Sequence, residues 1–301
     1  MFRLAHVTDP HFRGARGGEG VHAGDLFGKR AVGYVNLVVN RVRKHKMELL
    51  EDMRLDLRAQ APDHLAVTGD LSNIAVTSEW RSALAWLDLS GVAPDAISVI
   101  PGNHDAYVPE VLATREFERL FAPYQTSDLD RDGESAYYPF VQIREPLALI
   151  GVSSAVATGD LGAWGEIGKE QLARLEAILK APELAALTRV VLVHHPPVVH
   201  KEGENRNLRD RDAFAQVIAR AGADLVLHGH DHEDQHAELP GPDGRAIPVI
   251  GAGSASYTGG PERRARYSVY EFEGRSITWV SRVHDEETSF FREARREKLA
   301  R

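Results

Sequence analysis

Five short groups of polar residues stand where apolar runs of the chain end. In order they are Asp9-Pro10-His11, Gly69-Asp70, Gly102-Asn103-His104-Asp105, His194-His195-Pro196-Pro197 and Gly229-His230-Asp231-His232. Their imidazole, carboxylate and amide groups are the donors that bind zinc, manganese, iron or cobalt. Any one group is a common turn sequence. Five of them, each following an apolar run, favour one shared site.

Seven of these side chains are candidate ligands, which is too many for one four-coordinate ion. Seven donors suit two divalent ions that share a carboxylate and keep positions open for water and substrate. Such a pair of ions can clamp the attacking and leaving oxygens of an in-line displacement and lower the pKa of a bound water to about 7. The candidates are Asp9, His11, Asp70, Asn103, one histidine of the His194-His195 pair, His230 and His232.

The elements that must position these side chains are strands and helices in alternation. Short runs rich in Val, Ile and Leu are typical of strands buried on both faces, and the stretches between them repeat apolar residues at helical spacing. This alternation predicts an α/β fold, in which ligands gather beyond the carboxyl ends of the strands. The predicted strands are 4–7, 64–67, 97–100, 147–152, 190–193 and 225–227, and the predicted helices are 78–89, 169–179 and 212–221.

Two parts of the chain depart from this alternation. Residues 247–256, 266–274 and 276–283 indicate strands, the last two as a hairpin, and the charged tail at 285–301 is interpreted as a terminal helix or a frayed end. Residues 14–46 combine a Gly-rich loop with a mixed apolar and basic stretch. We interpret this segment as an insertion near the site, and the competing interpretation is a helix that packs one apolar face on the core and leaves a basic end in solvent. No linker-like stretch divides the chain, so residues 1–301 are predicted to form a single domain.

Composition disfavours several classes of protein. The 301 residues contain no cysteine, which excludes disulfides and thiolate metal sites, and the formal net charge of −8 does not favour binding to long nucleic acid. No apolar run is long enough for a transmembrane helix, although residues 26–46 leave peripheral membrane contact open. The first residues lack the apolar run of a signal peptide, so a cytoplasmic location is expected. Nothing in the sequence indicates an oligomeric state.

The order of the motifs resembles the calcineurin-like metallophosphoesterase superfamily. Asp-x-His, Gly-Asp, Gly-Asn-His-Asp, His and Gly-His-x-His follow one another between residues 9 and 232. The segments VLVHHPPV and LVLHGHDH are most similar to the bacterial phosphodiesterase branch that includes the class III cyclic-nucleotide phosphodiesterases. The resemblance implies a four-layer α/β/β/α sandwich of two mixed sheets flanked by helices, with a dinuclear metal site at the carboxyl ends of the strands.

The resemblance also implies a role for each motif residue. Asp70 would bridge two divalent ions of manganese, iron, zinc or cobalt. His104 would face the scissile phosphate and protonate the leaving oxygen or stabilise its developing charge, and Asp105 would orient His104 by a hydrogen bond. Of the paired histidines, His194 rather than His195 would be the ligand. The first ion would be held by Asp9, His11 and His232, and the second by Asn103, His194 and His230.

Three further residues are candidate substrate contacts. Arg13 follows the first motif closely, Asn73 follows Asp70, and His195 would lie behind the ligands or on the substrate side. For Asn73 a purely structural role in the turn is the competing interpretation.

The favoured function is hydrolysis of a small phosphodiester, such as a cyclic nucleotide or a glycerophosphodiester, by a metal-bound hydroxide that attacks phosphorus. Two alternatives keep the fold: a nucleotide-sugar lipid pyrophosphate hydrolase of the UDP-diacylglucosamine type, which residues 26–46 raise, and a phosphomonoesterase. A non-catalytic scaffold is disfavoured because all seven ligands and His104 are present. A redox dimetal protein is disfavoured because such sites typically use Glu-rich helical bundles.

Overall fold

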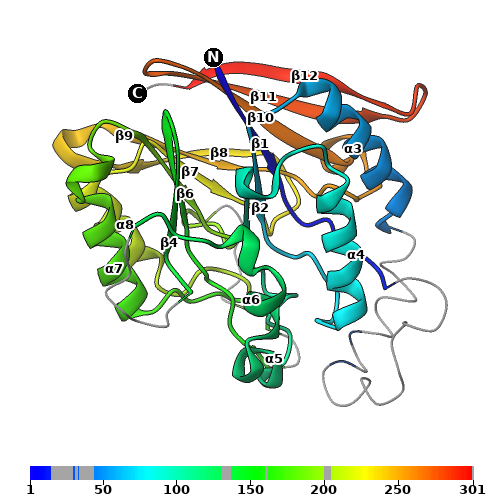
Figure 1. Cartoon of the computed structure of the whole chain (residues 1–301), viewed down its shortest axis with the longest axis horizontal. Helices are drawn as coiled ribbons and strands as arrows, with labels where there is room; N and C mark the ends of the chain where they lie inside the picture. Colours follow the sequence, from blue (N-terminus) through cyan, green and yellow to red (C-terminus); the bar gives the residue numbers. More distant parts are fainter. Residues whose placement is uncertain are drawn as a thin grey trace.

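The computed structural model describes residues 1–14, 30, 33, 44–129, 137–159, 162–199 and 205–299 (Figure 1). Two six-stranded sheets form its centre. The first sheet has the strand order β12-β11-β10-β1-β2-β3, in which β1, β2 and β3 are parallel and the other pairings are antiparallel. Its strands are β1 (Phe2–Val7), β2 (His64–Thr68), β3 (Ile97–Ile100), β10 (Arg266–Glu273), β11 (Ser276–Asp285) and β12 (Phe290–Leu299).

The second sheet has the strand order β4-β5-β6-β7-β9-β8. Its four inner strands are parallel, and an antiparallel strand closes each edge. Both sheets are therefore mixed, as predicted. The strands are β4 (Phe140–Arg144), β5 (Leu147–Gly151), β6 (Thr188–Leu192), β7 (Leu225–His228), β8 (Gln235–Pro240) and β9 (Ala246–Gly251).

Helices cover the outer face of each sheet. Figure 1 shows α7 and α8 on one side of the molecule and α3 and α4 on the other, with the sheets between them. The α-helices are α3 (Met47–Gln60), α4 (Thr77–Asp88), α5 (Pro109–Thr114), α6 (Glu116–Leu120), α7 (Lys169–Leu179) and α8 (Arg211–Ala221). Short 3₁₀ turns lie at Pro94–Ala96, Ala122–Tyr124, Pro182–Leu184, Pro242–Gly244 and Pro261–Arg263.

Three apolar clusters hold these layers together. One lies between the sheets and includes Leu4, Phe140, Leu192, Tyr270 and Trp279. A second joins the first sheet to α3 and α4, and a third joins the second sheet to α7 and α8. The central strands are buried on both faces because each face meets another layer. The predicted α/β/β/α sandwich is thereby confirmed.

The C-terminal tail differs from its prediction. Residues 290–299 form the edge strand β12, antiparallel to β11, and not a helix or a frayed end. Its inward-facing Phe291 and Leu299 are buried, and Arg292 and Arg296 pair with Asp285 and Glu271. Charged side chains protect edge strands from pairing with other chains, so this strand lacks the apolar alternation from which strands are predicted. The predicted hairpin of β10 and β11 is confirmed.

The predicted insertion at 14–46 lies almost wholly outside the described residues. Of its basic and apolar stretch at 26–46, the structure describes Arg30, Gly33 and residues 44–46. Arg30 donates hydrogen bonds from Nε and Nη2 to the backbone carbonyls of Ile74 and Ala75, at 3.1 and 2.6 Å. Among the described helices, none combines the length and the apolar character needed to cross a bilayer.

Candidate dinuclear metal site

The first cluster of predicted ligands joins the loops that follow β1, β2 and β7. His232 Nε2 lies 3.1 Å from Asp9 Oδ1 and 3.3 Å from His11 Nε2. Asp70 Oδ2 lies 3.8 Å from His11 Nε2. Each of the four residues offers one donor atom within 4.8 Å of the others. Asp9, His11 and Asp70 are buried, while His232 is partly exposed.

The second cluster joins the loops after β3, β6 and β7. Asn103 Oδ1 lies 3.2 Å from His194 Nε2 and 3.0 Å from His230 Nδ1. Asp70 Oδ1 lies 3.5 Å from His194 Nε2. Asp70 thus presents one carboxylate oxygen toward each cluster. The structure brings all seven predicted ligands together, in two groups that meet at this side chain.

Local backbone geometry marks the same residues. Five predicted ligands have positive φ angles: Asp9 at 51°, His11 at 48°, Asp70 at 54°, His230 at 73° and His232 at 57°. Non-glycine residues seldom adopt this left-handed conformation, which costs them about 1–2 kcal/mol each. Only four other non-glycine residues of the described chain share it. Strain of this kind gathers at functional sites, where the surrounding fold imposes it.

Two glycines allow the loops after β2 and β3 to meet. Gly69 has a φ of 89°, in the left-handed region that glycine tolerates. A Cβ atom on Gly102 would collide with the backbone nitrogen and Oδ1 of Asp70. Side chains at these positions would separate Asp70 from Asn103, so the two clusters depend on this close backbone approach.

The arrangement of lone pairs suits bound cations. His194 Nδ1 lies 2.7 Å from the Thr68 carbonyl and His11 Nδ1 lies 3.1 Å from the Ser72 carbonyl. A carbonyl only accepts, so Nδ1 carries the proton in each neutral ring and Nε2 is an acceptor. His194 Nε2 then faces Oδ1 of Asn103 and Oδ1 of Asp70, which are acceptors too. Donors about 2.1 Å from one ion, at right angles, lie about 3 Å apart, as these atoms do. The residues therefore fit a dinuclear centre.

Charge states in the clusters favour the same chemistry. Burial raises the pKa of Asp9, but the charge and hydrogen bond of His232, together with His194 and His11, outweigh burial and hold that pKa well below its usual value. Burial, together with His195 and His194, holds the pKa of His230 well below its usual value. An ionised carboxylate and a neutral imidazole are the forms that bind metal.

His104 lies at the same place, but Asp105 does not orient it. His104 Nδ1 donates to the backbone carbonyl of Asn73 at 2.6 Å, so proton exchange is left to Nε2. Asp105 instead accepts bonds of 2.8–3.1 Å from the backbone N–H groups of Leu71, Ser72 and Gly102, the Ser72 hydroxyl and the Trp80 indole. The predicted hydrogen bond from Asp105 to His104 is wrong. Asp105 positions the loops after β2 and β3, because it accepts hydrogen bonds from backbone N–H groups of both loops.

The three predicted substrate contacts have different outcomes. Asn73 is buried and donates from Nδ2 to the carbonyls of His11 and Phe12, which favours the structural interpretation of this residue. His195 is buried behind the ligands, with Nδ1 on the Ser154 hydroxyl at 2.8 Å and Nε2 on the Ala163 carbonyl at 3.2 Å. Arg13 is half-buried and is not among the described residues that line the cavity of the site.

Glu79, at the start of α4, gives the loop after β2 a pH-dependent support. Its Oε2 accepts from the N–H groups of Asn73 and Ile74 at 3.1 Å, and burial raises the pKa of Glu79 from 4.5 to about 7. The folded chain therefore holds a proton that the unfolded chain loses between these pH values. The contribution of protonated Glu79 to the free energy of unfolding is fully present below pH 4.5 and is lost as the pH rises through 7.

Glu79→Gln is expected to remove this pH dependence. Relative to the variant, the wild type should lose on the order of 3 kcal/mol of unfolding free energy between about pH 4.5 and 8, because glutamine stays neutral throughout. Urea titrations of both proteins at several pH values across this window measure the difference. Curves that run parallel would show that Glu79 keeps an ordinary pKa in the folded chain.

A cavity of about 430 Å³ opens onto both clusters. Asp70, Asn103, His230 and His232 line it together with His104. The sequence did not single out Arg263, which also lines it. Arg206, from the polar loop before α8, lies there with its Nη2 3.0 Å from Asp231 Oδ1. Four predicted ligands, His104 and two guanidinium groups thus share one opening.

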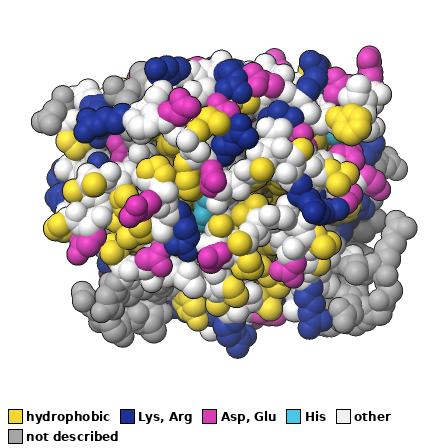
Figure 2. Space-filling view, turned by 45° about the horizontal axis from the view of Figure 1, so that its top comes forward, with side chains coloured by type: hydrophobic (Ala, Val, Ile, Leu, Met, Phe, Trp, Pro, Cys, Tyr) yellow, Lys and Arg dark blue, Asp and Glu magenta, His cyan; other side chains and the backbone are white. Residues whose placement is uncertain are grey.

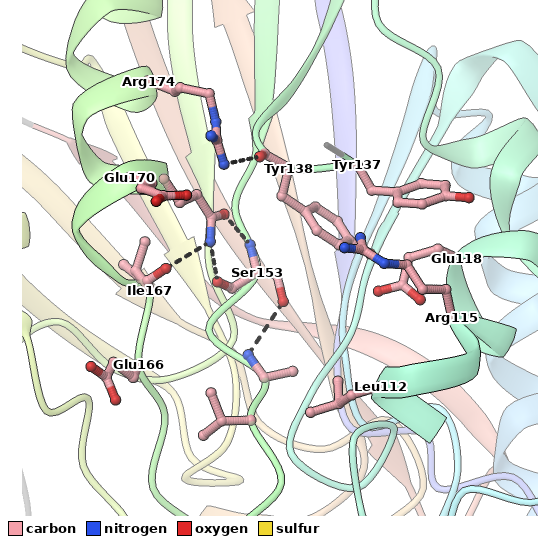
Figure 3. A pocket seen from close by; sticks show the side chains of 13 residues that line it. Leu112, Arg115, Glu118, Tyr137, Tyr138, Ser153, Glu166, Ile167, Glu170 and Arg174 are labelled. Carbon is pink, nitrogen blue, oxygen red and sulfur yellow. Dashed lines mark hydrogen bonds between the residues drawn. The ribbon is translucent and has the colours of Figure 1, made fainter. Parts of the chain in front are cut away.

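A larger cavity, of about 740 Å³, lies elsewhere and has a different lining (Figure 3). Figure 3 shows Glu170 and Arg174 of α7 on one side and Leu112, Arg115 and Glu118 of the α5–α6 region on the other. Arg174 donates to the Tyr138 carbonyl at 3.2 Å. None of the predicted ligands borders this cavity, so residue chemistry and not size identifies the site.

One buried histidine beside the predicted ligands, His45, belongs to none of the five sequence motifs. His45 precedes α3 and lies against His11 and His232, and the three offer donor atoms within 4.8 Å of one another. It lies outside the five strand-end motifs, so the pattern that located the predicted ligands does not include it. Its position depends on a contact with residues 256–258, far away in the sequence.

Comparisons with known structures extend these observations. A dimetal phosphatase from Danio rerio is 15% identical, with a TM-score of 0.64 over 99% of this chain and 98% of that one. A purple acid phosphatase from yellow lupin (Lupinus luteus) seeds is 11% identical, with a TM-score of 0.63 over 99% of this chain and 53% of that one. At these identities the likeness concerns the fold. No curated protein matches the chain at comparable significance.

A protein-family model provides the assignment. The model described as calcineurin-like phosphoesterase matches residues 2–234, which run from the first strand through the last of the five motifs. This match covers well over half of the 301 residues. With the sandwich of mixed sheets and the meeting of the seven motif ligands, it establishes that the chain belongs to the calcineurin-like phosphoesterase family.

Proposed function

We propose that the chain hydrolyses small phosphodiesters with two divalent ions, one held by Asp9, His11 and His232 and the other by Asn103, His194 and His230, with Asp70 shared between them. The observation that carries this proposal is Asp70, whose two oxygens lie 3.8 and 3.5 Å from one imidazole of each cluster. Two such ions, when bound, activate a water and neutralise charge on a phosphoryl group. Imidazole-rich donors of this kind suit manganese, iron, zinc or cobalt.

The chain's own residues supply the remaining chemistry. His104 lines the cavity and gives a proton from Nε2 to the leaving oxygen, while the Asn73 carbonyl fixes its Nδ1. Arg206 and Arg263 line the same cavity and bind phosphoryl or distal oxygens of the substrate. Asp105 holds the loops after β2 and β3 in register, so that Asp70 and Asn103 stay together.

The shape of the cavity favours a diester of modest size. Besides the predicted ligands and His104, its lining includes Ala163, Asn205, Arg206 and Arg263, which provides a place for a second ester arm. On the face shown in Figure 2, lysine and arginine side chains are interspersed with aspartate and glutamate. This mixture of signs does not favour a long polyanion. A small phosphodiester, such as a cyclic nucleotide or a glycerophosphodiester, is the substrate class that we propose.

A phosphomonoesterase is the second candidate. The two similar structures above are described as phosphatases, which is the observation in its favour. The lipid pyrophosphate alternative depends on residues 26–46, most of which lie outside the described residues. Arg30, one basic residue of that stretch, bonds to backbone carbonyls of the chain itself.

A kinetic comparison on metal-stripped protein tests the proposal. The protein is reloaded with manganese, zinc, iron or cobalt and assayed with bis(p-nitrophenyl) phosphate and p-nitrophenyl phosphate, with the stripped protein as blank. We expect metal-dependent turnover with a higher kcat/KM for the diester. A higher value for the monoester would replace the diesterase with a phosphatase, and absence of turnover with every metal would reject both.

A further inference from the structure

His45 enters the site from outside the motif set. The segment 44–46 runs antiparallel to residues 256–258: Lys46 N–H donates to the Ser256 carbonyl at 3.0 Å, and Thr258 N–H donates to the Lys44 carbonyl at 2.7 Å. This short pairing places His45 beside the loop that follows β9. The side chain is buried, with 4% of its surface exposed.

The ring of His45 lies against the first ligand cluster. Its centroid is 4.6 Å from that of His11 and 5.6 Å from that of His232, with interplanar angles of 74° and 87°. One ring nitrogen from each of the three lies within 4.8 Å of the others. Three imidazole nitrogens gathered within this distance need only small shifts of their rings to reach one ion, for which the nitrogen–metal distance is about 2.1 Å.

His45 is oriented as the predicted ligands are. Its Nδ1 lies 2.8 Å from the Ser256 hydroxyl, as Nδ1 of His11 lies on the Ser72 carbonyl and Nδ1 of His194 on the Thr68 carbonyl. Ligating histidines typically engage their other ring nitrogen in this way, which fixes the ring and its tautomer. A hydrogen-bond path also ties His45 to the cluster, from Ser256 N–H to the Ser254 hydroxyl and from there to the Asp9 carbonyl.

We propose that His45, through Nε2, is a further ligand of the ion held by Asp9, His11 and His232. A third imidazole gives this half of the site more nitrogen than the other, which favours zinc, iron or cobalt over magnesium or calcium. It also leaves fewer positions open to water on this ion. The inference rests on the proposed dinuclear centre, but it adds to the seven ligands that the motifs supply.

Metal binding without turnover tests this ligand. Wild type, His45→Ala, His45→Gln and a control, His284→Ala, are stripped and titrated with Co²⁺ by calorimetry and visible absorption. His284 is also buried and pairs with Asp52 at 3.2 Å, so the control loses a buried imidazole away from the site. We expect both His45 variants to bind one of the two ions about 10–100-fold more weakly, with an altered Co²⁺ spectrum, while the control resembles the wild type.

Each outcome bears on a separate claim. Two ions bound equally by wild type and both His45 variants, with unchanged spectra, would overturn the inference and leave the proposed function intact. Unchanged metal affinity with weaker binding of inorganic phosphate would make His45 a phosphate contact and would overturn it also. Failure of the wild type to bind any ion would reject the proposed function itself. Should His45→Ala not fold without metal, His45→Gln keeps the volume of the side chain and gives the same test.

Discussion

Asp70→Asn is expected to lose both ions and, with them, to lower kcat/KM by at least about 10³-fold. Asparagine keeps the shape of the side chain and an oxygen to accept the His104 N–H bond, which is 2.8 Å long in the wild type. It removes the negative charge that the two clusters share. Metal-ion stabilisation of a phosphoryl transfer contributes several kcal/mol, and each 1.36 kcal/mol is a factor of ten in rate, so loss of the ions has a large effect.

Metal analysis and unfolding separate this effect from misfolding. Ions per chain are counted after dialysis against a fixed Co²⁺ concentration, and Asp224→Asn is the control. Asp224 is a buried carboxylate that bonds to the Arg189 backbone at 2.8 Å, at the opposite end of β7 from the site. The control should keep two ions.

The unfolding temperature of the metal-free protein provides a second test of the role of Asp70. Without cations, Asp70 Oδ1 faces the acceptor Nε2 of His194, and the charge of Asp70 is near that of Asp9. Removing that charge relieves repulsion, so metal-free Asp70→Asn should unfold at the same temperature as the metal-free wild type or a higher one. A variant that kept both ions and most of its activity would show that Asp70 is not shared between them.

The strand-end pattern predicted most of the site because parallel strands deliver their next residues to one edge. Asp9 and Asp70 follow β1 and β2, which are hydrogen-bonded neighbours, and His194 and His230 follow β6 and β7 in the other sheet. Face-to-face packing of the sheets then brings the two edges together. These relations follow from alternating apolar runs and need no knowledge of long-range contacts.

Asp105 shows where nearness in sequence misleads. A carboxylate beside a working histidine suggested a direct bond between them. In the fold the two side chains diverge: His104 meets the Asn73 carbonyl, and Asp105 meets three backbone N–H groups of the adjoining loops. Unpaired N–H groups in a buried turn need an acceptor, and this need decides where Asp105 lies.

His45 and β12 were missed for a different reason. The place of His45 is set by pairing with residues 256–258, and β12 is an edge strand whose charged residues resemble a solvent-exposed helix. For His45 the decisive contact is with a segment more than two hundred residues away in the sequence. For β12 it is the position at the edge of a sheet, and in neither case does the local pattern of apolar residues reveal it. Periodicity reports which face of an element is buried, but it does not report which distant segment covers it.

His104→Ala is expected to keep both ions and to lower kcat by about 10²–10⁴-fold, the usual contribution of a general acid. His104 is not one of the seven proposed ligands, and its Nδ1 is held by the Asn73 carbonyl at 2.6 Å. Its ring stacks on Tyr107 with the centroids 5.5 Å apart, so the position of Nε2 is fixed before substrate arrives. Metal content and the unfolding temperature should therefore change little.

A series of aryl phosphodiesters with increasingly basic leaving groups distinguishes proton transfer from simple charge stabilisation. A good leaving group departs without a proton, whereas a poor one needs it, so the variant should lose most activity on the poorest leaving groups. The slope of log kcat against leaving-group pKa should become more negative in His104→Ala. His236→Ala is the control, since this histidine pairs with Glu297 at 3.0 Å on β12, at the outer edge of the sandwich.

The form of the loss decides which role His104 has. If kcat falls equally for every leaving group, His104 stabilises charge on the phosphoryl group and does not donate the proton. If the poorest leaving groups are cleaved as fast as by the wild type, His104 has no part in the reaction, and the proton must come from solvent or from another residue of the cavity. A parallel loss of metal would instead make the His104 side chain part of the scaffold, through its hydrogen bond to the Asn73 carbonyl.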